Sequence, residues 1–125
     1  MVSPQVWSDR VDAACADAGA DHVHLQSATP ETEHEAVEHA VEVDRLSDAI
    51  LHAVEQGGLP RGREQSAEML LSQLGQLAEQ TGLFADAASA GDRAAATAAV
   101  AEITVLGAQI NPVAIDLSVP SCGGF

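Results

Sequence analysis

The sequence contains no lysine and no tyrosine, and aromatic residues make up only 2% of its 125 positions. Five arginines face nineteen acidic residues, so the formal net charge is −14. Such a charge repels nucleic-acid phosphates and anionic lipid, and the sequence has no basic patch with aromatics that would stack on bases. We therefore expect no direct nucleic-acid partner.

Long apolar runs are also scarce. No run reaches the roughly 18 residues of a membrane span, which predicts no transmembrane segment. Acidic and basic residues interrupt positions 1–20, so these positions do not form the apolar core of a signal peptide. If Met1 is the native start, the chain is cytoplasmic; if a leader precedes the mature domain, the chain is exported.

Cysteine is limited to Cys15 and Cys122, near opposite ends of the chain. The absence of CxxC and CxxCH spacing argues against a zinc ribbon, a thioredoxin-type site and a c-type haem. A bond between the two cysteines would close nearly the whole chain into a loop. Helical geometry permits this bond if residues 118–122 fold back along the first helix, and two free thiols remain the alternative.

What the chain has in abundance is alanine, arranged with Leu, Val and Ile at three-and-four spacing. A chain of this length forms one domain. Proline and glycine punctuation predicts helices over 4–18, 30–56, 63–89 and 93–117, with Pro112 kinking or breaking the last one. Residues 20–28 are expected to form an extended connector. The predicted fold is an all-α, up-down-up-down four-helix bundle.

The apolar positions predict which side chains form the core. We expect Trp7 and Phe84 to act as core anchors, because they are the large aromatic residues within the helical patterns. Val6 belongs to the apolar stripe of the first helix, and Val100 to that of the last. The last stripe has the pattern of a domain core, although it would also suit a partner helix or a lipid.

Several sparse features resemble small secreted proteins and lipoproteins of actinobacteria, which are helical domains with a cysteine near each end. The features are Trp7 with Cys15 eight residues later, the turn of Gly58, Pro60 and Gly62, the Gly91–Asp92 hairpin and the closing run of Ala114, Leu117 and Cys122. This resemblance spans about residues 5–122. It implies a helical fold and an extracellular or cell-envelope location, and it transfers no active site.

The second predicted helix holds most of the candidate chemistry. Residues 31–56 contain six Glu, two Asp and one Arg, a charge of −7 that is half of the total. His34 with Glu38, and Glu35 with His39, lie one turn apart, so either pair has the spacing to hold a divalent ion such as zinc or iron. HExxH-type zinc motifs need histidines four apart, whereas these are five apart, about 140° around the helix. A three-histidine site would require His22 and His24 to fold over this helix.

The sequence therefore leaves the functional class open. Our first interpretation is a non-enzymatic acidic bundle without a cofactor, a secreted or cell-envelope binding protein for an unknown protein or small ligand, either monomeric or weakly self-associating. The alternative is a metal-binding bundle that uses the residues of the second helix. A third interpretation is a carrier with an apolar cavity under Trp7 and Phe84. No catalytic residue is predicted, because no nucleophile has a histidine at a useful spacing.

Overall fold

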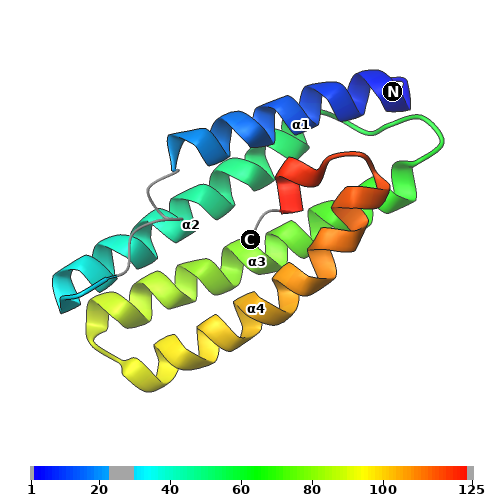
Figure 1. The fold of residues 1–125 in the computed structure, drawn as a ribbon. Coiled ribbons are helices and arrows are strands. Elements are labelled where there is room, and N and C mark those ends of the chain that lie inside the picture. Colours follow the sequence, from blue (N-terminus) through cyan, green and yellow to red (C-terminus); the bar gives the residue numbers. More distant parts are fainter. Residues whose placement is uncertain (1, 23–29, 124–125) are drawn as a thin grey trace.

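A computed structural model describes residues 2–22 and 30–123, and within these ranges it contains four α-helices and one short 3₁₀-helix. The elements are α1 (Pro4–Asp21), α2 (Glu33–Gln56), α3 (Glu64–Ala90), α4 (Arg93–Asp116) and η2 (Pro120–Gly123). Consecutive helices run in opposite directions and pack against each other (Figure 1). The predicted up-down-up-down four-helix bundle is confirmed.

Capping residues fix the helix ends that the sequence indicated best. The Ser3 hydroxyl accepts a hydrogen bond from the backbone N–H of Val6, directly before a proline at the first helical position. Gly91 adopts a left-handed φ of 73° after α3, and the Asp92 carboxylate then caps α4 by accepting from Ala95 N–H. The resulting α3–α4 hairpin is the one that the sequence predicts.

Two predicted helix ends are wrong. The first helix continues past Gly19 to Asp21, because glycine weakens a helix without forbidding it. The second helix begins at Glu33 instead of at position 30. Its cap is Thr32, whose hydroxyl accepts from Glu35 N–H while the Glu35 carboxylate accepts from Glu31 N–H. The remainder of the predicted connector, residues 23–28, lies outside the described residues.

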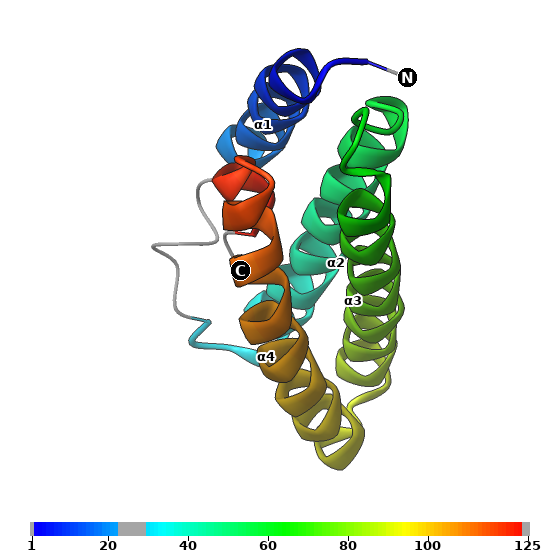
Figure 2. The same ribbon diagram turned by 90° about the vertical axis from the view of Figure 1, so that its right-hand side faces the viewer.

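The C-terminal segment closes the bundle between its first and last helices. Ser118 has a φ of 61° and turns the chain back, so that η2 packs against both α1 and α4 (Figure 2). There Cys122 forms a disulfide with Cys15, and its Cα lies 5.1 Å from that of Cys15. Both cysteines are fully buried. The disulfide and the backward path of residues 118–122 agree with the bonded alternative.

The last helix passes through Pro112 without a break, since α4 is continuous to Asp116. Pro112 and Ala108, whose carbonyl loses a partner because proline has no N–H, are both exposed. Water can therefore reach that carbonyl, which explains why the helix tolerates the proline.

The core lies where α1 and η2 meet α2, α3 and α4. It contains Trp7, leucines of α3 and both cysteines. Val100 was expected in this core but is 43% exposed, and Val6 is 48% exposed. Both residues sit at the margin of their helix's apolar stripe, and each helix buries only the side that its neighbours cover.

Candidate functional site

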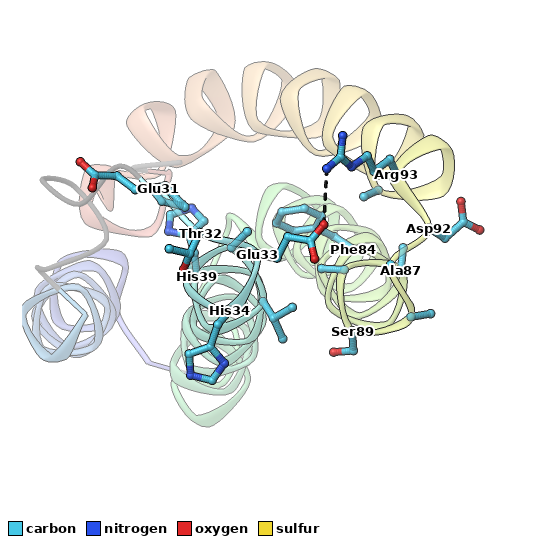
Figure 3. A pocket seen from close by; sticks show the side chains of 17 residues that line it. Glu31, Thr32, Glu33, His34, His39, Phe84, Ala87, Ser89, Asp92 and Arg93 are labelled. Atoms are coloured by element: carbon cyan, nitrogen blue, oxygen red, sulfur yellow. Dashed lines mark hydrogen bonds and ion pairs between the residues drawn. The ribbon is translucent and has the colours of Figure 1, made fainter.

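A pocket of about 690 Å³ lies at the pole where α2 and α4 begin and α3 ends (Figure 3). We call it the α2–α4 pocket. Its apolar lining consists mainly of alanines from all three helices around Phe84, together with Val37. Small side chains on diverging helices leave space that larger residues would fill, because a protein interior otherwise packs tightly. The volume falls within the range typical of small-molecule sites.

Charged residues surround the opening of the α2–α4 pocket. Glu31 and Glu33 come from the start of α2, while Asp92 and Arg93 come from the start of α4. The Arg93 guanidinium lies 3.4 Å from the Glu33 carboxylate, which links the two helices across the pocket (Figure 3). These two side chains are 89% and 91% exposed, so the ion pair contributes little stability and can open for a ligand.

Two of the predicted metal ligands lie on different sides of α2. His34 is exposed and its Nε2 contacts the Glu38 carboxylate at 2.9 Å. His39 is half-buried and projects in another direction, as the spacing of five residues implies (Figure 3). Glu35 is occupied in capping α2, where its carboxylate accepts from Glu31 N–H. The structure thus brings the predicted pair of His34 and Glu38 together, while His39 lies on another side of the helix.

His22 has an acidic neighbour on α2. It follows α1 directly, and its Nδ1 lies 2.8 Å from the Glu42 carboxylate, which also accepts from Arg45. The hydrogen bond with His22, assisted by Arg45 and opposed by partial burial, lowers the pKa of Glu42 below its ordinary value of 4.5. His24 lies outside the described residues. Over residues 2–22 and 30–123, no group of three or more His, Cys, Asp and Glu side chains has a metal-binding arrangement.

Trp7 and Phe84 occupy different regions, and among the described residues they line different pockets. Trp7 is 1% exposed, and its indole N–H donates to the Gly58 carbonyl at 2.9 Å near the α2–α3 connection. Phe84 is half-buried and lines the α2–α4 pocket near the other end of α3. Phe84 thus lines the α2–α4 pocket, whereas Trp7 lines a separate, smaller pocket of about 90 Å³ together with Pro4 and Pro60. Sequence reasoning considered an apolar cavity near Phe84 but did not place it where α2 and α4 begin, because its alanine lining looks like ordinary core.

One helix differs from the expectation that no segment would suit a membrane. Within the described part of the chain, α4 alone is long and apolar enough to cross one. Only 28% of its apolar stretch is buried. Length and composition are weak evidence of a span, since core helices of soluble proteins pass the same test. The result does show that α4 exposes an unusually apolar surface.

Comparisons with known protein families, with curated proteins and with solved structures give no match to this chain.

Proposed function

We propose that this protein is a non-enzymatic binding protein and that the α2–α4 pocket takes a small ligand with an apolar body and a positively charged group. The observation that carries this proposal is the pocket itself, an alanine-lined hollow around Phe84 with carboxylates at its opening. Apolar surface supplies binding free energy when it is removed from water, and a few charged groups at the edge orient the ligand.

The charges around the pocket favour a cation over an anion. Glu31, Glu33 and Asp92 outnumber Arg93, and the whole molecule carries a formal charge of −14. A cationic ligand is thus attracted at long range and can contact a carboxylate once Arg93 moves aside. The same field would repel an anionic ligand.

The test uses three probes with the same alkyl chain, n-octylammonium, n-octanol and n-octanoate, titrated calorimetrically at a moderate salt concentration. We expect saturable binding in the order ammonium, alcohol, carboxylate. Ala36→Trp places a large ring at the exposed edge of the pocket and should weaken all three probes. Ala13→Trp, at an exposed site on α1, is the matched control. Absence of saturable binding by every probe at millimolar concentration would refute the proposal.

The charge preference is tested separately from the cavity. The double variant Glu31→Gln and Glu33→Gln should reduce the preference for n-octylammonium over n-octanol without abolishing n-octanol binding. Glu68→Gln removes one carboxylate from an exposed site on α3 and controls for the general field. An unchanged preference in the double variant would show that the carboxylates at the opening do not select the ligand.

We further propose that the protein works outside the cytoplasm. The Cys15–Cys122 bond supports this location, because disulfides persist mainly in oxidising compartments. Rapid alkylation of the protein in intact producing cells, followed by mass spectrometry, tests it. Two alkylated thiols would indicate a reducing compartment, whereas an unmodified, oxidised protein accessible from outside the cells is the expected result.

A further inference from the structure

The solvent side of α4 is apolar although the rest of the molecule is strongly acidic. Val105 and Ile115 are 50% and 58% exposed on it, and Val100 at its margin is 43% exposed. Between Ala94 and Ile115 the sequence has a single charged residue, Glu102. Large apolar side chains are here left in water along a 24-residue helix, which is the pattern of a surface that another molecule covers.

The spacing of the exposed residues indicates what kind of partner fits. Among the exposed positions of α4, one set recurs at steps of four and three, which is the a/d repeat of a coiled coil. We call this set the α4 face; it consists of Ala94, Ala98, Ala101, Val105, Ala108, Pro112 and Ile115. A repeat of this period keeps one side of a helix in register with another helix over its whole length.

Charge indicates which helix could cover the α4 face, either α4 of a second copy or another of the helices. The other helices all carry carboxylates at exposed positions, including Asp9 and Asp17 on α1, Glu38 on α2, and Glu79 on α3. Two molecules with a net charge of −14 meet with least repulsion where neither presents a carboxylate. The α4 face meets that condition apart from Glu102 at its edge.

We propose that the α4 face pairs with the α4 face of a second copy in antiparallel orientation, giving a two-fold symmetric homodimer. Arg93 begins α4 and Asp116 ends it. Arg63 of the same copy already forms an ion pair with Asp116, and antiparallel pairing brings Arg93 of the second copy near this carboxylate at both ends. It also places opposite ends of the two helix dipoles together. A parallel pair would bring like charges together at each end.

The proposal predicts an unusual salt dependence. Repulsion between the two acidic molecules opposes the dimer, and salt screens this repulsion while leaving the apolar contact intact. Dimerisation should therefore strengthen as salt rises. Recruitment of a basic helix by the acidic surface would weaken under the same change, because there the charges attract.

Sedimentation equilibrium of the full chain, from about 10 µM to about 1 mM protein and at low and high salt, measures the association. We expect a monomer–dimer equilibrium whose dissociation constant falls as salt rises. Val105→Glu should raise this constant at least about tenfold, because two-fold symmetry places two carboxylates in each interface. Gln76→Glu adds the same charge at an exposed site on α3 and should have little effect. Circular dichroism verifies that both variants remain helical.

Orientation is tested by Arg93→Gln. An antiparallel dimer loses attraction at both ends and should weaken a fewfold, whereas a parallel dimer would lose repulsion and strengthen, which would overturn the proposed orientation. A 12.8 kDa monomer at every protein and salt concentration would refute the dimer. So would equal weakening by Val105→Glu and Gln76→Glu. Val105-dependent binding of the monomer to neutral phosphatidylcholine vesicles, without dimerisation, would assign the face to lipid instead.

Discussion

The backbone N–H of Ser121 donates a hydrogen bond to the carboxylate of Asp12 at 2.9 Å, joining residues 109 positions apart. Beside it lies the Cys15–Cys122 bond, and the Cys122 sulfur is 3.8 Å from the Val11 carbonyl oxygen. These contacts dock η2 on α1. The C-terminal segment thereby lies between the first and last helices and links them.

The disulfide should contribute a large part of the stability. Replacing both Cys15 and Cys122 by alanine removes a crosslink across 107 residues, and the chain-entropy estimate for such a loop is about 4.7 kcal/mol. We expect the free energy of unfolding to fall by about 3–5 kcal/mol in denaturant titrations followed by the fluorescence of the single tryptophan, Trp7. A fall below about 0.5 kcal/mol would contradict the entropic account.

The Asp12–Ser121 hydrogen bond should stabilise the docking of η2 on α1 independently of the disulfide. Asp12→Ala leaves the Ser121 N–H without its carboxylate partner and should lower the free energy of unfolding by about 1–3 kcal/mol. Asp17→Ala, at an exposed position on the same helix, is the control and should change it by less than about 0.5 kcal/mol. Both are measured by chemical denaturation with the disulfide intact. Equal effects would mean that helix propensity, and not the hydrogen bond, is responsible.

Two glycine substitutions should have opposite effects. An alanine Cβ at Gly57 would lie 2.4 Å from Val11 Cγ2 and 3.4 Å from Trp7 Nε1, so Gly57→Ala should destabilise the fold by about 1–3 kcal/mol. At Gly75, within α3, nothing lies within 4 Å of an added Cβ. Gly75→Ala should therefore stabilise the fold by up to about 1 kcal/mol, because alanine favours the helix. Thermal unfolding of both variants compares them, and a destabilising Gly75→Ala would refute the argument.

Two carboxylates on α2 should give opposite pH effects. The pKa of Glu42 is lowered chiefly by its hydrogen bond with His22, so the ionised carboxylate stabilises the fold above the ordinary pKa of 4.5. This stabilisation is lost as the pH falls through the pKa of Glu42 in the folded state. Glu42→Gln should destabilise the fold at neutral pH and have little effect in acid.

Asp48 on the same helix should show the opposite effect. Burial, and then the charge of Asp44, raise the pKa of Asp48, so its ionised form opposes folding. Asp48→Asn should stabilise at neutral pH, and this gain should vanish below the unfolded-state pKa.

Denaturation at a series of pH values measures both effects. The two difference curves should have opposite signs at neutral pH and converge toward zero in acid, because protonated carboxyls resemble their amide replacements. Two curves of the same sign would show that the local environments of Glu42 and Asp48 do not control these effects. Glu38→Gln removes an exposed carboxylate of α2 and serves as the comparison for a general change in net charge.

The helices themselves were predictable because local interactions specify them. Ser3 followed by Pro4, and Gly91 followed by Asp92, carry their capping chemistry within a few residues. The start of α2 was predicted three residues too early, at position 30, because a proline favours the first turn of a helix. The hydrogen bonds of Thr32 and Glu35 place the start at Glu33, and they depend on the geometry of the folded turn.

The candidate site was less predictable than the fold. The histidines of α2 were predicted as ligands because imidazole binds metal ions. In the described structure His34 and His39 lie on different sides of the helix, and His22 pairs with Glu42. The alanines of the α2–α4 pocket carry no such signal. A residue such as Ala88 lines a cavity or packs a core according to how far the neighbouring helix diverges, and the sequence does not encode that distance locally.

The sequence alone therefore determined the four helices, their order, the acidic surface and the possibility of a Cys15–Cys122 bond, because propensity, capping and charge are properties of neighbouring residues. Tertiary structure alone decided that η2 packs between α1 and α4, that Phe84 lines an open pocket where α3 ends, and that Val100 and Val105 of α4 face solvent. Which side of an apolar helix is covered depends on where its partners lie. That position is set by packing across the whole chain.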